Sequence, residues 1–273
     1  MRVDIHTHSF PAHKAPEVIA TLVRKSAKRC PLTPQGNGTI ADLVSQEIAD
    51  GFDRFAICPI AVRPEQFNYM TRFMHALSSG ACGPEAKERV IPCVSLHPDD
   101  EDAELHIRVL IELGAKMVKL HPYFQQTCLD SRKMIRLLRV ITDAGLPILC
   151  HTGGDISYDS EPMAGPTQIL NAYRRVPGLR MICAHCASWK HPEAIKFLLG
   201  RSIYVDLSYQ KQGGTEPIVR AFAEQHPQDY LLFGSDWPWG RPGKHAATIA
   251  SWNIDKPRLD AIMGGNAARI LNL

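Results

Sequence analysis

Short apolar runs recur along the chain, and each is followed by a segment in which apolar residues return every three or four positions. The runs are rich in β-branched and other apolar residues and are bounded by glycine, proline or polar residues, which is typical of buried strands. Strands followed by helices in regular alternation predict βα units and a parallel sheet. Eight such strands are predicted, at residues 2–6, 54–60, 89–96, 115–121, 146–151, 179–185, 202–208 and 230–236.

The segments between these strands carry helix start and stop signals. Residues 39–51 begin with Thr39, have Asp42 three positions later and end at Gly51, which is the pattern of a capped helix. The helical segments 99–114 and 130–145 also end in glycine directly before the next strand. Eight βα units in 273 residues predict a single (β/α)8 TIM barrel. The alternative, a doubly wound open sheet, is disfavoured because no G-x-G-x-x-G turn follows any strand.

The connection after the first strand is longer than a minimal barrel requires. Residues 15–29 have the spacing of an extra helix, and an irregular stretch follows them up to residue 38. Loops of this length are usually lids, binding loops or disordered segments. No repeat, low-complexity tract or linker divides the chain, so we expect a single TIM-barrel domain over residues 1–273, with a helical insertion after strand 1.

Composition excludes several classes of protein. The chain is 45% hydrophobic and 22% charged, and its apolar runs are far shorter than the ~20 residues of a membrane span. The N-terminus has no signal-peptide core, so we expect a cytoplasmic location. The net charge is only +3 and no basic cluster occurs, which disfavours nucleic-acid and membrane partners. We expect a small-molecule substrate and leave open whether the chain forms a homodimer.

The cysteines are too few for a disulfide scaffold. Cys58, Cys93, Cys150 and Cys183 lie within apolar runs, where free cysteine behaves as a small hydrophobic residue. Cys183 also forms a C-x-x-C pair with the cysteine three positions later, but without a second such pair or a thioredoxin-like context. We therefore expect reduced thiols.

Histidine, lysine and aspartate residues stand at the ends of the predicted strands. A barrel brings these ends to one mouth, and residues two apart on a strand face the same side. Neutral imidazoles with a carboxylate are the ligands expected for Zn²⁺ or a similar divalent ion. Each residue alone could be a hydrogen-bonded strand end or a helix cap, but their coincidence favours a metal site. The residues are His6, His8, Lys119, His121, His151, His185 and Asp236.

These residues lie in motifs that resemble the amidohydrolase superfamily, most closely the branch related to aminocarboxymuconate semialdehyde decarboxylase. The motifs are DIHTH (4–8), VKLHP (118–122), ILCHTGG (148–154), MICAHCAS (181–188), LLFGSDWPWG (231–240) and GGNAARIL (264–271). The resemblance spans the chain. It implies that His6, His8, His151 and Asp236 are metal ligands and that His185 is the catalytic histidine of strand 6.

The resemblance also bears on the number of metal ions. In binuclear members of the superfamily a lysine on strand 4 is carbamylated and bridges two metals, whereas one metal is common in the branch that this sequence resembles. We expect one divalent ion, Zn²⁺ before Mn or Fe, with Lys119 uncarbamylated and either ion-paired or holding a substrate anion. Carbamylation of Lys119 would instead imply two metals. His121 is expected to contact substrate.

A divalent ion in this site would activate water near neutral pH. Asp236 would accept the proton of that water, and His185 would polarise a carbonyl or carry a proton to the leaving group. We therefore expect hydrolysis of an ester, lactone or amide bond in a small carboxylate-bearing molecule. The alternatives are a non-oxidative decarboxylase on the same scaffold, a phosphoesterase, for which these strand ends supply few carboxylates, and a catalytically inactive binding barrel.

Loops after the strands offer substrate contacts, since βα loops carry function on this scaffold. An arginine at the mouth would suit a substrate carboxylate through paired hydrogen bonds, and His97 is expected to be a polar contact rather than a ligand. The candidates are Arg63 after strand 2, Tyr123 and Gln125 after strand 4, and Trp237, Trp239 and Arg241 after strand 8.

Overall fold

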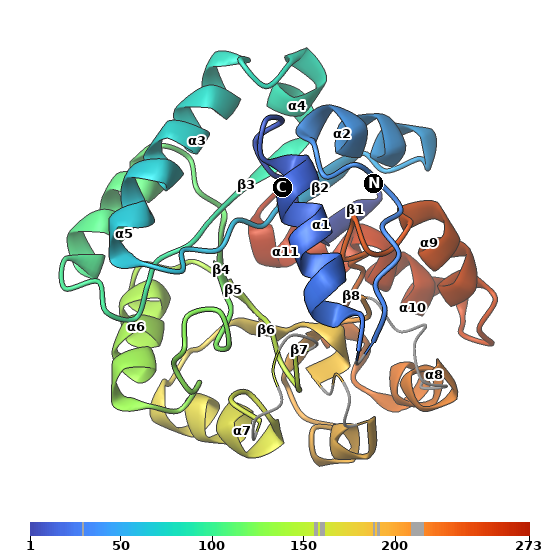
Figure 1. Cartoon of the computed structure of the whole chain (residues 1–273). Helices are drawn as coiled ribbons and strands as arrows, with labels where there is room; N and C mark the ends of the chain where they lie inside the picture. Colours follow the sequence, from blue (N-terminus) through green and yellow to red (C-terminus); the bar gives the residue numbers. More distant parts are fainter. Residues whose placement is uncertain (29, 156–157, 159–161, 188, 190–191, 209–215) are drawn as a thin grey trace.

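Eight parallel strands form one sheet in the order β1 to β8, and this sheet is rolled into a TIM barrel (Figure 1). The computed structural model describes the chain except residues 29, 156–157, 159–161, 188, 190–191 and 209–215. The strands are β1 (Val3–Thr7), β2 (Arg54–Ile57), β3 (Val90–Val94), β4 (Met117–Leu120), β5 (Ile148–Cys150), β6 (Met181–Cys183), β7 (Tyr204–Asp206) and β8 (Leu231–Leu232).

Contacts between the first and last strands close the barrel. The amide of Ile5 donates to the carbonyl of Phe233 at 3.2 Å, and Thr7 forms a parallel bridge with Trp237. The predicted fold is therefore confirmed. The strands are shorter than the predicted runs because buried residues such as Cys58 and Leu96 continue the apolar pattern into loops after the hydrogen-bonded ladder has ended.

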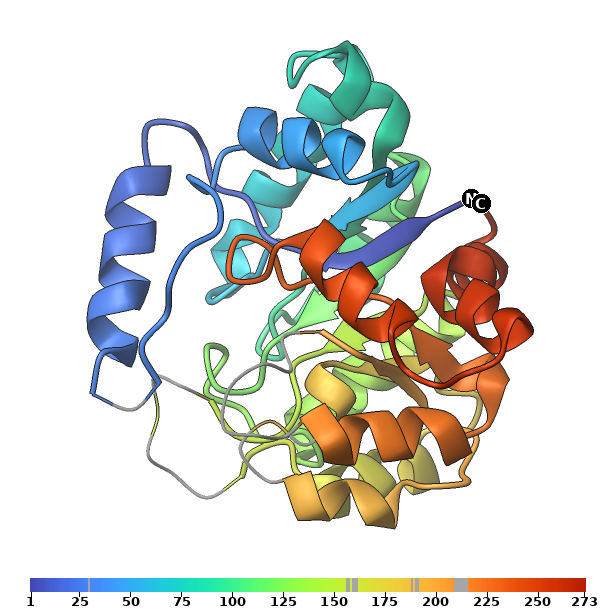
Figure 2. The ribbon, with the colours of Figure 1, turned by 90° about the vertical axis from the view of Figure 1, so that its right-hand side faces the viewer.

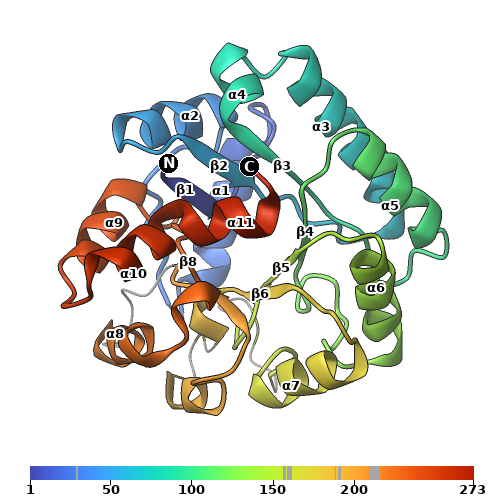
Figure 3. The same ribbon diagram turned by 180° about the vertical axis from the view of Figure 1, so that it is seen from behind.

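Helices follow the strands. They are α1 (Ala15–Ser26), α2 (Ile40–Ala49), α3 (Phe67–Ser79), α4 (Pro84–Arg89), α5 (Ala103–Glu112), α6 (Arg132–Asp143), α7 (Pro166–Arg175), α8 (Glu216–Gln225), α9 (Pro242–Ala250), α10 (Lys256–Asp260) and α11 (Asn266–Leu271). Most form the outer ring, while α1 and α11 lie across the two ends of the barrel (Figure 2 and Figure 3). Thr39 caps α2 by accepting from the amide of Asp42 at 3.2 Å, as predicted. No helix in the described part of the chain is long and apolar enough to cross a membrane.

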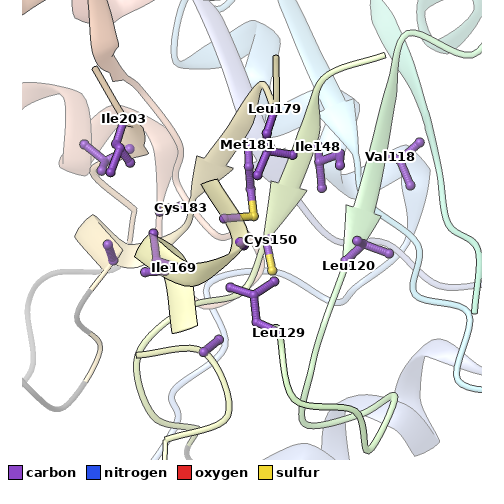
Figure 4. Close-up of a cluster of buried hydrophobic side chains, with 14 of the residues drawn as sticks. Val118, Leu120, Leu129, Ile148, Cys150, Ile169, Leu179, Met181, Cys183 and Ile203 are labelled. Atoms are coloured by element: carbon purple, nitrogen blue, oxygen red, sulfur yellow. The ribbon is translucent and has the colours of Figure 1, made fainter. Parts of the chain in front are cut away.

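The largest apolar layer lies between the sheet and the surrounding helices. Figure 4 shows Ile148 and Cys150 of β5 beside Met181 of β6, with Leu129 and Ile169 completing the layer. Every one of these side chains is fully buried. Fully burying an aliphatic side chain contributes roughly 1.5–3 kcal/mol, so this layer holds the helices against the barrel.

A second apolar cluster fills the half of the barrel interior that is nearer the amino ends of the strands. It includes Val3, Ile5, Met117 and Leu149 from the strands, and residues of α11 pack against it. Figure 3 shows α11 crossing this end of the barrel. The interior is therefore closed at the amino ends of the strands, and chemistry is confined to the opposite mouth, as is usual for this fold.

An irregularity in β1 turns its histidines toward the mouth. Val3 and Ile5 point into the interior cluster, so strict alternation would send His6 outward together with Asp4. Instead the pairing of β1 with β2 shifts register between Asp4 and Thr7, and His6 lines the cavity at the mouth. A bulge of this kind re-aims the side chains that follow it.

Helix α1 is the extra helix predicted after the first strand, and it ends at Ser26 rather than at residue 29. Figure 1 shows it crossing the front of the barrel, and Figure 2 shows it standing away from the strands, on the side opposite the two chain ends. Ala15 and Ser26 are buried at its ends, whereas Val18 and Leu22 are only partly buried. The helix therefore spans the mouth without packing tightly on the barrel.

Candidate metal centre

Three predicted ligands converge at the mouth of the barrel. The Nε2 atoms of His6 and His8 lie 3.2 Å apart. Oδ1 of Asp236 lies 3.5 Å from Nε2 of His6 and 3.3 Å from Nε2 of His8. β1 supplies His6, the residues just after β1 supply His8, and the loop after β8 supplies the carboxylate.

Hydrogen bonds on the far side of each ring identify the free nitrogens. Nδ1 of His6 lies 2.8 Å from the carboxylate of Asp206, and Nδ1 of His8 lies 2.9 Å from the carbonyl oxygen of Cys58. Both partners can only accept, so both Nδ1 atoms carry the proton and both Nε2 atoms present lone pairs. The contact between the two Nε2 atoms is therefore not a hydrogen bond, and with Asp236 it forms a cluster of acceptors that favours a cation.

The spacing of these donors fits a divalent metal ion. Tetrahedral Zn²⁺ with Zn–N distances of about 2.0–2.1 Å has neighbouring ligand atoms about 3.3–3.4 Å apart. The three observed separations, 3.2, 3.3 and 3.5 Å, agree with this value. His6, His8 and Asp236 are thus able to hold the ion, and a further coordination position is left for another ligand.

Lys119 lies directly beside this cluster. It is 1% exposed, and its Nζ lies 2.7 Å from Nε2 of His6. The ammonium group donates into the lone pair that a metal ion would use, so Lys119 and the ion compete for His6. Its hydrogen-bond partner is a histidine nitrogen and not the carboxylate expected of a structural ion pair.

His151 and His185 form a second cluster of acceptors. Nε2 of His151 donates to the carbonyl of Gly154 at 2.8 Å, which leaves a lone pair on Nδ1. That Nδ1 lies 3.1 Å from Nε2 of His185. Nδ1 of His185 lies 2.9 Å from the hydroxyl of Ser208, which itself donates to Asp206 at 2.5 Å. Nε2 of His185 therefore also carries a lone pair. The two lone pairs, on Nδ1 of His151 and Nε2 of His185, face each other and need a shared proton or a cation between them.

The four predicted ligands thus divide into two groups. His6, His8 and Asp236 have donor atoms within 4.8 Å of one another. His151 is not part of that group and faces His185 and, through its other nitrogen, Asp155 at 3.7 Å. Its ring also stacks on His121, with centroids 4.1 Å apart. This second group is where a second ion would be held.

Burial keeps these imidazoles uncharged. Burial, followed by the charge of Lys119, lowers the pKa of His6 well below its usual value. The same two causes lower the pKa of His151 to about 3. Burial and the neighbouring His151 lower the pKa of His185 and of His121. Neutral imidazole is the form that ligates metals and accepts protons.

The backbone is held in unusual conformations at two of these residues. His185 and Asp236 have φ values of 56° and 57°, in the left-handed region that non-glycine residues rarely adopt. Such strain persists only where the surrounding structure imposes it, and it is frequent at functional sites. A Cβ on Gly234 would lie 2.8 Å from Cβ of His6, so β8 can approach β1 only with glycine at this position.

Asp206 organises the site from beneath, and sequence reasoning missed it. One carboxylate oxygen accepts from the amides of His185 and Ser208 at 2.9 and 3.0 Å, and the other pairs with Nδ1 of His6. Asp206 and Ser208 stand two apart at the end of β7, so the spacing that identified His6 and His8 was available here too.

Replacing the carboxylate of Asp206 is expected to weaken metal binding. The Asp206→Asn substitution keeps the size of the side chain but removes the charge that fixes the His6 tautomer. Loss of such a partner typically costs about 10–100-fold in metal affinity. Competition with a chelator measures the change, and the exposed Asp229→Asn substitution is the matched control. Unchanged affinity in Asp206→Asn would contradict this role.

The loop residues predicted to contact substrate are mostly placed elsewhere. Arg63 is exposed and does not line the cavity. Arg241 pairs with Asp50 through two hydrogen bonds of 2.6 and 2.9 Å. Trp237 is fully buried and donates to the side-chain oxygen of Gln46 at 3.1 Å.

Two further predicted contacts support the site from outside. The hydroxyl of Tyr123 donates to the carbonyl of Gly153 at 2.8 Å, and its ring packs edge-on against His151. Gln125 donates to the carbonyls of Ala61 and Leu96. His97 accepts from the amide of Asp99 at 3.1 Å. Trp239 is the member of the predicted loop set that lines the cavity.

A buried carboxyl pair lies behind β1. Asp4 accepts from the amides of His6 and Ser235 at 3.0 and 3.1 Å, which ties β1 to the loop that carries Asp236. Glu47 of α2 is fully buried near Asp4, and neither of its carboxyl oxygens nor Oδ2 of Asp4 has a hydrogen-bond partner among the described residues. Burial raises the pKa of Asp4 to about 7 and that of Glu47 well above its usual value. Because Asp4 already accepts two amides, Glu47 retains the proton.

This pair predicts a stability that depends on pH. Above about pH 5 both carboxyl groups are ionised in the unfolded chain, whereas the native pair holds a proton, so the native state loses stability as pH rises toward the native pKa. The unfolding free energy of Glu47→Gln minus that of wild type is therefore expected to increase between about pH 5 and 8, by up to about 1.4 kcal/mol per pH unit. Histidine contributions cancel in this comparison, which denaturant unfolding measures. A difference independent of pH would contradict the shared proton.

A cavity of about 490 Å³ opens above the donor clusters. His6, His8, Lys119, His151 and His185 line its base. This volume is typical of sites for small organic molecules. Sequence reasoning missed most of its upper wall, because those residues come from loops and from α1. They include Phe10, Lys14, Val18, Leu22, Leu32, Ile60, Phe124, Asp155 and Trp189.

Comparison with known proteins agrees with this architecture. The family model described as Amidohydrolase matches residues 3–273. No curated protein matches the chain significantly. Among solved structures, an uncharacterised TIM-barrel protein from Bordetella bronchiseptica has 16% identity and a TM-score of 0.77, with 99% of this chain and 98% of that one covered.

Two further solved structures carry names of enzymes. One is described as a probable 2-pyrone-4,6-dicarboxylic acid hydrolase from Acinetobacter baumannii with citric acid bound; it has 12% identity, a TM-score of 0.66, and coverage of 100% and 99%. The other is a 5-carboxyvanillate decarboxylase from Novosphingobium aromaticivorans with bound manganese; it has 14% identity, a TM-score of 0.67, and coverage of 100% and 97%. At these identities the likeness establishes the fold.

Proposed function

The chain belongs to the amidohydrolase family, and from this premise we propose that it is a metal-dependent hydrolase of an ester, lactone or amide bond in a small organic acid. The observation that carries the proposal is the convergence of three lone pairs, from His6, His8 and Asp236, at the base of a cavity. We propose one Zn²⁺ or a similar ion at these residues.

We assign the catalytic roles to the metal ion and to three side chains. A bound ion in such a site lowers the pKa of water and polarises the bond to be cleaved. Asp236 is the proton acceptor, and burial raises its pKa, which brings that carboxylate closer to the working pH of a general base. The uncharged His185 lines the cavity; its free Nε2 would take up the proton that Asp236 accepts from water and then pass it to the leaving group. Lys119 pairs with an anionic group of the substrate.

Decarboxylation is the second candidate, and the aromatic wall of the cavity favours it. The rings of His121 and Phe124 are stacked with centroids 4.0 Å apart and an angle of 4° between their planes. A planar unsaturated or aromatic acid fits beside such a wall. In this reaction a proton is delivered to the ring carbon, the bond from that carbon to the carboxylate breaks, and CO₂ leaves. The manganese-containing neighbour named as a decarboxylase gives the same reaction class.

One experiment separates the two reactions. Metal-loaded protein is incubated with a panel of lactones and esters and with a panel of unsaturated and aromatic acids, while acid release and CO₂ release are recorded in parallel. Acid release without CO₂ supports the hydrolase, and CO₂ release from the acids supports the decarboxylase. The His8→Ala variant supplies the background rate. Neither signal from metal-loaded protein would contradict both and favour a catalytically inactive binding barrel.

A further inference from the structure

The upper half of the cavity is a chamber with apolar walls, roofed by α1. Val18 and Leu22 lie one turn apart on α1 and both line the cavity, since residues four apart share a face of a helix. Leu32, from the stretch after α1, is buried and completes this roof. Figure 2 shows α1 held across the mouth at a distance from the strands.

The walls below the roof are also lined by apolar and aromatic side chains. Phe10, Ile60, Phe124 and Trp239 line the chamber from the loops after β1, β2, β4 and β8. These loops are distant in sequence, and each presents an apolar or aromatic side chain to the same space. Ligand sites of this kind bind mainly through apolar contact, with a few polar groups fixing orientation.

Positive charge is scarce in this chamber. Among the described residues that line the cavity, the cations are Lys14 and Lys119, and no arginine is present. The side chain of Lys14 is 58% exposed and lies 4.0 Å from Glu17, so it is a rim residue surrounded by water. Lys119, at the base, is the buried cation. The described part of the lining therefore offers one buried ammonium group for a substrate anion, next to the proposed metal.

We infer that the substrate is a monoanionic acid, or its ester or lactone, with an extended hydrocarbon or aryl body. The reacting polar group lies at the base beside Lys119, and the apolar body fills the chamber beneath Val18 and Leu22. This inference rests on the proposed function for the position of the reacting group. Di- and tricarboxylates are not expected as substrates, because a second carboxylate in the chamber would lose its hydration and meet no buried cation among the described lining residues.

A matched series of acids tests the inference by binding alone. Metal-loaded protein is titrated with acetate, butanoate, hexanoate and octanoate, and with the diacids of four, six and eight carbons, using calorimetry or tryptophan fluorescence. Affinity for the monoacids is expected to rise about threefold to fourfold for each added methylene, and each diacid is expected to bind at least tenfold more weakly than the monoacid of equal length. A flat monoacid series, or diacids that bind as well as monoacids, would overturn the inference.

Two substitutions on α1 give the matched comparison. Leu22→Asp places a charge in the roof and is expected to flatten the chain-length series, because each added methylene then gains less apolar contact. Ala20→Asp places the same charge on the exposed face of α1 and is expected to leave the series intact. Circular dichroism and thermal unfolding check that both variants are folded. A preserved series in Leu22→Asp would also overturn the inference.

The test of the chamber and the test of the proposed function can fail independently of each other. Binding of the acids requires no turnover, so a chain-length series without hydrolysis of any ester would reject the hydrolase and retain the chamber. Hydrolysis of short esters with no preference for longer ones would retain the hydrolase and reject the chamber.

Discussion

The His8→Ala and Asp236→Asn variants are expected to lose turnover by roughly 10³-fold or more and to retain no stoichiometric metal. A catalytic metal supplies several kcal/mol of transition-state stabilisation, and each ~1.4 kcal/mol corresponds to a factor of ten in rate. His8→Ala removes one of three donors that meet within 3.5 Å of one another. Asp236→Asn exchanges the anionic donor for a neutral amide oxygen, which is a weaker ligand and a poor proton acceptor.

Elemental analysis of protein purified without added metal measures the stoichiometry. His75, an exposed histidine on α3, provides the control, and His75→Ala is expected to retain both metal and activity. One ion per wild-type chain supports the cluster of His6, His8 and Asp236. Two ions per chain would favour a second site that includes His151, together with carbamylation of Lys119. No ion, even after zinc or manganese is supplied, would contradict the metal centre.

The His185→Asn variant is expected to lower kcat by about 10²–10⁴-fold while the metal is retained. That range is typical for the loss of a positioned proton donor or acceptor. His185 is buried and neutral. Its Nδ1 contacts the hydroxyl of Ser208, and its Nε2 faces Nδ1 of His151. Asparagine occupies similar space but cannot transfer a proton.

A buried histidine outside the site controls for the loss of a packed ring. His226 is fully buried, and its Nε2 donates to the carbonyl of Ile203 at 2.9 Å. His226→Asn is expected to lower stability without a comparable loss of kcat. If His185→Asn loses the metal together with its activity, His185 is a ligand rather than a proton-transfer residue, and the assignment of its role is wrong.

The position of the proposed metal ligands at strand ends follows from local sequence. Strands 4 and 5 were predictable because their apolar runs are bounded by polar residues, and a barrel brings every strand end to one mouth. His6 and His8 could be paired from their spacing alone. Asp206 could have been noticed by the same spacing with Ser208. Its role could not be predicted, because no sequence motif marks a carboxylate that contacts the far side of a histidine ring.

Tertiary structure alone decided what surrounds those ligands. Arg241 follows the strand 8 motif, yet α2 places Asp50 where it neutralises that guanidinium outside the cavity. The bulge in β1 that turns His6 inward depends on the pairing with β2.

The sequence by itself determined the eight-unit barrel, the extra helix and the set of strand-end ligands, because each depends on residues close together in the chain. It did not determine that α1 lies across the mouth, or that Leu22 and Trp239 share one chamber. Those residues are separated by more than two hundred positions and carry only weak local preferences. Their meeting depends on the summed packing of the whole barrel, which no short stretch of sequence encodes.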